Sequence, residues 1–214
     1  MKKIGILGSG VVAKTLGSGF LKHGYEVMLG TRSAEKLDEW KSENSDGQVG
    51  SFTEAAAFGD IVVVAVKGSV AKSALEATGA ENFNGKIVID TTNPIGDTAP
   101  ENGVIGFFTD QNDSLMEQLQ RAFPDAKFVK AWNSIGSAFM VNPDFGSEKP
   151  AMFICGNDDD ARKEVSEILV QFGFEVEDMG MAEAARAIEP LCMLWCIPGF
   201  QDGSWNHAFR LLKK

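Results

Sequence analysis

Short apolar runs alternate with longer segments of helical periodicity along most of this 214-residue chain. The run from Ile61 to Val66 is apolar at every position, which is typical of a strand that is covered on both faces. Such runs with helices between them predict an α/β fold built on a doubly wound, mostly parallel sheet. The expected strands span residues 3–7, 26–30, 48–51, 61–66, 86–90, 127–131, 151–155 and 175–179.

Three of the intervening helices have well-marked ends. The helix expected over residues 11–23 stops at a glycine, and the helix over 159–172 opens with acidic residues. The third covers residues 181–195 and ends before Pro198, because proline interrupts a helix. Residues 93–113 are rich in proline and glycine, and they predict an irregular loop of the kind that is often functional.

A glycine-rich turn follows the first expected strand. The sequence Gly8-Ser9-Gly10-Val11-Val12-Ala13 stands between this strand and the first helix, as a dinucleotide fingerprint does in a Rossmann-type fold. Gly8 permits a tight turn, Gly10 lets a pyrophosphate approach the backbone, and Ala13 keeps the helix close to the strand. We therefore expect residues 8–12 to bind the cofactor through backbone amides and the helix dipole.

The end of the second expected strand indicates which dinucleotide binds. An NAD site usually has an acidic residue there, but this chain reads Gly30-Thr31-Arg32-Ser33, followed by Lys36. Hydroxyls and cations suit a 2′-phosphate, whereas a carboxylate would repel it. The pattern therefore predicts NADP(H). The alternative is that Arg32 and Lys36 only form a solvated start of a helix.

Composition and charge narrow the class of protein. The net charge of −10 argues against nucleic acid as a partner, and no apolar run is long enough to cross a membrane. The chain opens on a strand-like segment without a signal peptide, and its three cysteines suit a reducing compartment. We expect a cytoplasmic protein with a single domain over residues 1–214 and a helical C-terminal cap from about residue 181.

Four segments together resemble the NADPH-dependent F420 reductase family. They read Ile6-Leu7-Gly8-Ser9-Gly10, Gly30-Thr31-Arg32-Ser33, Thr91-Thr92-Asn93-Pro94 and Cys155-Gly156-Asn157-Asp158-Asp159. The family includes the F420H2:NADP oxidoreductases of archaea, and the reductase domain of the STEAP metalloreductases is related to it. The resemblance extends from residue 3 to about residue 190 and weakens toward the C-terminus.

The resemblance implies hydride transfer between NADP(H) and a small-molecule redox partner, F420 or FMN/FAD, whose ring stacks on the nicotinamide. The residues it places around the 2′-phosphate are Thr31, Arg32, Ser33 and Lys36, and those around the ribose and nicotinamide are Val66, Lys67, Asn93 and Pro94. The acceptor ring would lie beside residues 132–136, with Asn93, Asn133, Ser134 and Ile135 as pocket candidates. Archaeal members often have a histidine at the position of Asn133, so the resemblance leaves the acceptor open.

The sequence offers no clear proton donor for an alcohol or carbonyl substrate. Tyr25 and His23 follow the first helix, at the end of the sheet opposite the expected site. His207 lies in the C-terminal tail, and it could act only if that tail folds over the site. Transfer between two stacked rings needs orientation rather than a side-chain acid, so we expect no catalytic side chain.

Other candidate groups have simpler explanations. Cys192 and Cys196 lie one turn apart on an apolar helix, where core packing is the favoured interpretation over redox or metal chemistry. The acids Asp158 to Asp160 complement a helix dipole, and we expect no metal site. The apolar segment from Ala184 to Trp195 predicts a homodimer that buries this helix.

Two other functions remain open at this stage. One is a 3-hydroxyacid or imine reductase of the 6-phosphogluconate dehydrogenase type. Such enzymes add a long helical domain, whereas only about 35 residues follow the last expected strand here. The other is a non-enzymatic NADP(H)-sensing module, which would bind the dinucleotide without an acceptor pocket.

Overall fold

A computed structural model describes all residues, 1–214. Six parallel strands form the main sheet in the order β3-β2-β1-β4-β5-β6. This order reverses direction between β1 and β4, as expected for a doubly wound sheet. The strands are β1 (Lys3–Leu7), β2 (Glu26–Gly30), β3 (Gln48–Gly50), β4 (Ile61–Val64), β5 (Ile87–Asp90) and β6 (Lys127–Lys130). The predicted α/β fold is confirmed, and each strand lies within two residues of its expected bounds.

Helices cover both faces of this sheet, and the strands alternate between two apolar cores. Ile61 and Val63 of β4 belong to one core, and Val62 and Val64 belong to the other. The first core lies against α1 (Val11–Lys22), α2 (Asp38–Glu43) and α6 (Asp159–Gln171). The second lies against α3 (Phe52–Phe58), α4 (Gly68–Thr78) and α5 (Leu115–Ala122). Burial on both faces explains why the strands are almost wholly apolar.

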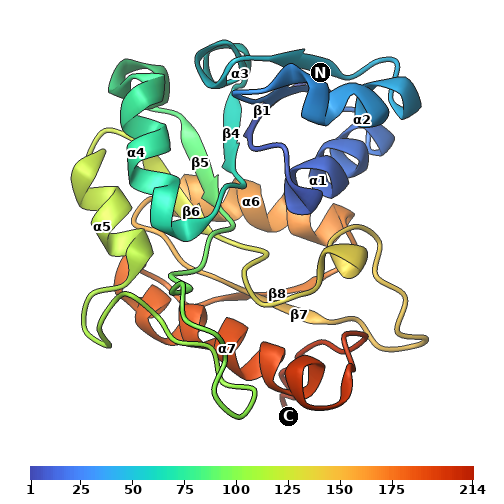
Figure 1. Cartoon of the computed structure of the whole chain (residues 1–214), viewed down its shortest axis with the longest axis vertical. Coiled ribbons are helices and arrows are strands. Elements are labelled where there is room, and N and C mark those ends of the chain that lie inside the picture. Colours follow the sequence, from blue (N-terminus) through green and yellow to red (C-terminus); the bar gives the residue numbers. More distant parts are fainter.

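The last two strands form a separate parallel pair rather than extending the main sheet. These strands are β7 (Ala151–Ile154) and β8 (Glu175–Asp178). A single antiparallel bridge between Lys130 and Cys155 joins the pair to the end of β6. Figure 1 shows the pair and the last helix, α7 (Ala185–Asp202), at one end of the molecule, with α2 and α3 at the other.

The helix α7 (Ala185–Asp202) corrects the expected end before Pro198. It continues through both Pro190 and Pro198 and ends only at Gly203, which has a φ of 77°. Pro190 is exposed and Pro198 half-buried, while Ile188, Cys192, Trp195 and Gly199 are buried. Tertiary packing of that buried face outweighs the backbone hydrogen bonds that the two prolines remove.

Residues 93–113 form the irregular segment that the sequence predicts. It contains only isolated bridges, Ile95 with Phe107 and Glu101 with Val104. The tail after α7 folds back over the molecule, since the carbonyl of Phe209 accepts a hydrogen bond from Ala151 at 2.8 Å. None of the helices is both long enough and apolar enough to cross a membrane.

Candidate functional site

The carboxyl edge of the main sheet gathers most of the predicted site residues. The segments that follow β1, β2, β4, β5 and β6 all emerge at this edge because the strands are parallel. They are residues 8–12, 31–36, 65–68, 91–94 and 131–136. The edge includes the point between β1 and β4 where the strand order reverses, the usual place for a ligand in this architecture.

The glycine turn has a backbone shape that only glycine can supply. Gly8 has a φ of 152°, and a Cβ added there would lie 2.3 Å from the carbonyl oxygen of Ala65. Its amide donates to the carbonyl of Gly30 at 3.0 Å and so ties the turn to the end of β2. The turn is therefore held rigidly between two strands.

Gly10 opens toward free space at the start of α1. A Cβ added at this position would meet no heavy atom within 4 Å. No side chain caps the helix that begins at Val11, so its first amides are not bonded by a capping group. An open surface above free amides at a helix N-terminus fits a pyrophosphate. The residues present therefore suit the dinucleotide that the fingerprint predicts.

The end of β2 presents two cations without protein partners. Arg32 and Lys36 are exposed, and neither forms an ion pair. The hydroxyl of Thr31 is used within the turn, because it donates to the carbonyl of Ser33 at 3.0 Å and accepts from the amide of Ser33 at 3.1 Å. Thr31 thus shapes the loop, while Arg32 and Lys36 remain available to an anion.

A carboxylate also lies close to this group of residues. The exposed Glu35 has a lowered pKa because of backbone hydrogen bonding and the hydroxyl of Ser33. This acid stands in the short helical turn Ala34–Leu37, beyond the end of the strand where the sequence pattern of an NAD site has its carboxylate. A 2′-phosphate would therefore meet one acid and two bases here.

The segment after β4 approaches the segment after β5 very closely. A Cβ on Gly68, the first residue of α4, would lie 2.0 Å from the carbonyl oxygen of Asn93. Lys67 precedes that glycine and forms an ion pair with Asp97 across the same gap. Val66 and Asn93 are half-buried and Lys67 is exposed, whereas Pro94 is buried. The structure thus brings together all four residues expected around the ribose and nicotinamide.

Asn93 and Asn133 form a reciprocal pair between the ends of β5 and β6. The side-chain nitrogen Nδ2 of Asn93 donates to the main-chain carbonyl oxygen of Asn133 at 2.8 Å. The side-chain nitrogen Nδ2 of Asn133 donates to Asn93 Oδ1 at 3.2 Å. Asn133 also donates to the carbonyl of Ile188 in α7 at 2.9 Å. Its own Oδ1 is buried without a hydrogen-bond partner. This oxygen, which is free to accept a hydrogen bond, lies among the residues expected beside the ring that receives the hydride.

The predicted acceptor segment is covered rather than open. Asn133, Ser134 and Ile135 are only 3, 4 and 7% exposed. Trp195 of α7 covers the segment, since a Cβ on Gly136 would lie 3.0 Å from its indole ring. Packing of α7 therefore fills the space above these three pocket candidates in this conformation.

The histidines and the tyrosine occupy three different surroundings. His23 stacks on the Phe172 ring and lies 3.2 Å from Asn142, while the Tyr25 hydroxyl donates to Gln171. The tail does bring His207 toward the covered segment, where its ring stacks on Trp195 and its Nε2 lies 2.8 Å from the Trp195 carbonyl oxygen. That nitrogen donates to a carbonyl, which makes His207 a structural contact of α7.

The cysteines lie away from any metal-binding cluster. Cys155, Cys192 and Cys196 are free thiols, and no group of three or more potential ligands could hold a metal ion. Burial raises the pKa of Cys155 to about 12. A hydrogen bond with Cys196, together with burial, raises the pKa of Cys192 well above its ordinary value. Cys155 and Cys192 therefore stay protonated near neutral pH, whereas the hydrogen bond with Cys192 lowers the pKa of the half-buried Cys196.

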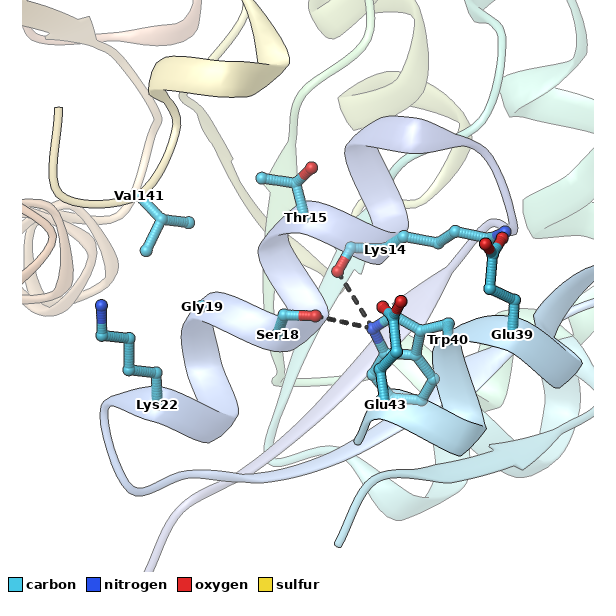
Figure 2. Close-up of a pocket in the computed structure, with 9 residues that line it drawn as sticks. All are labelled: Lys14, Thr15, Ser18, Gly19, Lys22, Glu39, Trp40, Glu43 and Val141. Atoms are coloured by element: carbon cyan, nitrogen blue, oxygen red, sulfur yellow. Dashed lines mark hydrogen bonds between the residues drawn. The ribbon is translucent and has the colours of Figure 1, made fainter. Parts of the chain in front are cut away.

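A hollow of about 460 Å³ lies between α1 and α2. Figure 2 shows Trp40 at its side, where the indole nitrogen donates to the Lys14 carbonyl at 3.1 Å and the Ser18 hydroxyl at 2.9 Å. The lining is mostly polar and includes Lys22, Glu39 and Glu43. It contains none of the residues predicted to bind the cofactor.

A buried charged cluster, which the sequence pattern did not predict, lies beneath the edge. Lys130 at the end of β6 contacts Asp90 at 2.7 Å and Glu189 of α7 at 2.8 Å, and all three side chains are at most 2% exposed. Burial lowers the pKa of the Lys130 ammonium, but the two carboxylates outweigh burial and raise it above its ordinary value. The sequence signal was that Asp90, Lys130 and Glu189 each follow an apolar residue within a largely apolar segment.

Comparisons with known proteins agree with this arrangement. The sequence profile of the family described as NADP oxidoreductase, coenzyme F420-dependent, matches residues 3–94. The structure of a candidate F420-dependent NADP reductase from Arthrobacter sp. FB24 superimposes with a TM-score of 0.93, at 32% identity and over the whole of both chains.

Two curated relatives show how far the similarity extends. The F420-dependent NADP reductase of Methanocaldococcus jannaschii is 26% identical over 180 residues, covering 79% of each chain. Metalloreductase STEAP3 of Rattus norvegicus is 32% identical over 201 residues, which are 92% of this chain. The chain spans only 38% of the length of that metalloreductase.

Proposed function

The chain belongs to the coenzyme F420-dependent NADP oxidoreductase family, and on that premise we propose that it transfers a hydride between NADP(H) and a flavin or deazaflavin such as F420. The observation that carries this proposal is the open surface above Gly10, together with the unpaired cations Arg32 and Lys36 at the end of β2. The first suits a pyrophosphate and the second a 2′-phosphate.

The chain's own residues would bind and orient the reactants. The first amides of α1 would hold the pyrophosphate, and Arg32 would hold the 2′-phosphate. The nicotinamide, when bound, supplies the hydride. The Asn93–Asn133 pair and Lys67 would set the position of the ring, and α7 would exclude water from the reacting atoms.

The proposal needs no side-chain acid or base. Hydride transfer to a flavin-like ring is chemistry that the two cofactors carry, so the protein has to supply orientation. Neither Tyr25 nor His23 lies at the carboxyl edge, and His207 is bonded to a carbonyl of α7. An alcohol or carbonyl substrate would require a proton donor there. The side chains around Asn93 therefore favour a second ring as hydride acceptor.

The acceptor would reach the nicotinamide beneath α7. Ser134 and Ile135 are covered in this conformation, so binding of the acceptor would require a displacement of the α7 side chains that cover them. The unpartnered Oδ1 of Asn133 would then accept a hydrogen bond from the acceptor or from the carboxamide of the nicotinamide. The same displacement would place the acceptor in an apolar, water-poor space.

We also propose that two copies of the chain associate through α7. Leu194 and Phe200 on this helix are 55 and 48% exposed, and Trp205 beyond it is 40% exposed. Apolar side chains that gather in one region usually cover an interface. Light scattering after size-exclusion chromatography tests the dimer, and a mass near 23.1 kDa would contradict it.

A panel of cofactors and acceptors tests the proposed function. NADPH and NADH are each offered with F420, FMN, FAD and a quinone, and oxidation is followed by absorbance. We expect NADPH to be oxidised with at least one flavin or deazaflavin. Tight NADP⁺ binding without turnover would instead indicate a sensing module.

A further inference from the structure

The ammonium group of Lys130 uses all of its hydrogen-bonding capacity inside the protein. Its three donors match three acceptors, which are Asp90 Oδ2 at 2.7 Å, the Thr92 carbonyl oxygen at 2.8 Å and Glu189 Oε1 at 2.8 Å. The side chain is completely buried. These acceptors come from β5, from the loop that follows it and from α7, so one cation joins three parts of the fold.

The two carboxylates extend the connection beyond Lys130. Asp90 Oδ1 accepts from the Thr92 amide at 2.9 Å and from the Thr92 hydroxyl at 2.7 Å. Glu189 accepts from the amides of Leu115 and Met116 at 3.0 Å each, at the first turn of α5. The backbone of Thr92 is therefore held through its carbonyl, by Lys130, and through its amide, by Asp90.

Thr92 directly precedes the residue that faces the expected nicotinamide site. Asn93 is bonded to Asn133, and Asn133 is bonded to the carbonyl of Ile188, the neighbour of Glu189 in α7. Two parallel connections thus join the loop after β5 to α7, one through Lys130 and one through Asn133. Both would have to shift together if α7 moved relative to this loop.

We propose that Lys130 is a positioning residue, which fixes the loop of Thr92 and Asn93 against α7 and so sets the hydride-transfer geometry. This inference rests on the proposed function, because it assigns Asn93 to the nicotinamide side of the site. Lys130 touches neither the glycine turn nor Arg32. Its effect should therefore fall on the transfer step rather than on capture of the dinucleotide.

Substituting Lys130 with methionine tests the inference. Lys130→Met keeps a long unbranched side chain but leaves Asp90, Glu189 and the Thr92 carbonyl without their shared donor. We expect kcat for NADPH oxidation to fall about a hundredfold, since a displacement of about 1 Å at a reacting group can have that effect. The affinity for NADP⁺, measured by titration calorimetry, should stay close to that of the unmodified protein.

A matched control separates positioning from loss of folded protein. Lys213→Met removes a lysine from another buried carboxylate, Glu177, on β8 in the small sheet. We expect this variant to keep both kcat and NADP⁺ affinity. If Lys130→Met lowered kcat and the number of NADP⁺ sites in proportion, Lys130 would be merely structural and the inference would be wrong.

A second variant and a second readout keep the inference testable if Lys130→Met does not fold or if no acceptor is turned over. Glu189→Gln preserves shape and removes one charge, and we expect a smaller fall in kcat in the same direction. Hydrogen exchange with NADP⁺ bound should be faster in residues 91–95 and unchanged in β1. Unchanged exchange in residues 91–95 and unchanged kcat would overturn the inference. Inactivity of the unmodified protein alone would instead count against the proposed function.

Discussion

The side chains of Asn93 and Asn133 hydrogen-bond across the ends of two neighbouring strands, with Asn93 donating to the Asn133 carbonyl at 2.8 Å and Asn133 donating back at 3.2 Å. Neither contact could arise within one strand or loop, because forty positions separate the two residues. The pair therefore depends on the parallel pairing of β5 with β6, which brings the ends of the two strands together. It also connects the expected nicotinamide site to α7 through the carbonyl of Ile188.

Replacing Asn133 with alanine should weaken both folding and turnover. The change removes the two hydrogen bonds that the Asn133 side chain donates, to Asn93 Oδ1 and to the buried Ile188 carbonyl, which should cost about 1–3 kcal/mol of unfolding free energy. We also expect a lower kcat, because Asn93 Oδ1 loses its donor, although the Asn93 side chain still donates to the main-chain carbonyl of residue 133. Urea unfolding and steady-state kinetics measure the two effects. Asn84→Ala, at an exposed position, is the control and should change neither.

Substitution of Gly10 by alanine should weaken NADP(H) binding without lowering the stability of the fold. A Cβ at Gly10 meets no protein atom within 4 Å, so Gly10→Ala should melt at nearly the same temperature as the unmodified protein. The same methyl would project into the space above the free amides of α1, and NADP(H) affinity should fall sharply. Calorimetric titration and thermal melting are the measurements.

A contrasting glycine provides the control for this substitution. A Cβ at Gly5 would lie 1.9 Å from the carbonyl oxygen of Ala55, so Gly5→Ala should lower the melting temperature strongly. If Gly10→Ala bound NADP(H) as tightly as the unmodified protein, the cofactor would not lie over the glycine turn.

Arg32 should decide the preference for NADPH over NADH. Charge-assisted hydrogen bonds to a phosphate contribute about 1.5–3 kcal/mol, so Arg32→Ala should raise the KM for NADPH about 10- to 100-fold. The KM for NADH should hardly change, because NADH has no 2′-phosphate. Arg121→Ala, which removes another exposed arginine on α5, serves as the control. Equal effects on both dinucleotides would refute the assignment of Arg32.

The sequence was sufficient to predict the strands of the sheet, but not the contacts that join the segments after β5 and β6 to α7. The strand Ile61–Val64 is apolar on both sides because both of its faces are buried, and such runs are visible without any knowledge of the fold. The glycine turn was equally visible, since its residues are adjacent in the chain. Local sequence patterns thus predicted those parts of the site whose residues are adjacent in the chain.

The remaining features depend on long-range packing. Lys130 belongs to a strand and Glu189 to a helix 59 residues later, so no local pattern indicates their contact. The helix α7 continues through Pro198 because its buried face packs against the rest of the molecule, which local propensity cannot anticipate. The same packing covers Ser134 and Ile135, and no local pattern around these residues indicates that cover.

The protein should become less stable in acid as the carboxylate of Glu117 is protonated. Burial raises the pKa of its carboxyl, but hydrogen bonds from Arg186 and Ser114 outweigh burial and lower it to about 2. Because the pKa in the folded state is depressed, the stabilisation is fully present above about pH 4.5 and is lost as the pH falls toward 2. This contribution to the free energy of unfolding is at most about 3 kcal/mol. The actual value should be smaller, because Arg186 is partly exposed and solvent screens the ion pair.

The variant Glu117→Gln isolates this contribution. Unfolding free energies of both proteins are measured by denaturant titration from pH 7 to pH 2. The difference between the two should shrink as the pH falls below 4.5, because protonated Glu117 then resembles glutamine. A difference that stayed constant with pH would show that the carboxylate charge does not contribute.

The central claim is that this chain oxidises or reduces NADP(H) against a flavin-like ring, and single-turnover absorbance with equal concentrations of NADPH and acceptor tests it most directly. The account predicts that absorbance of NADPH is lost together with reduction of F420, FMN or FAD, and that NADH reacts at least about tenfold more slowly. NADPH that stays unoxidised with every acceptor, or NADH that reacts as fast as NADPH, would contradict it.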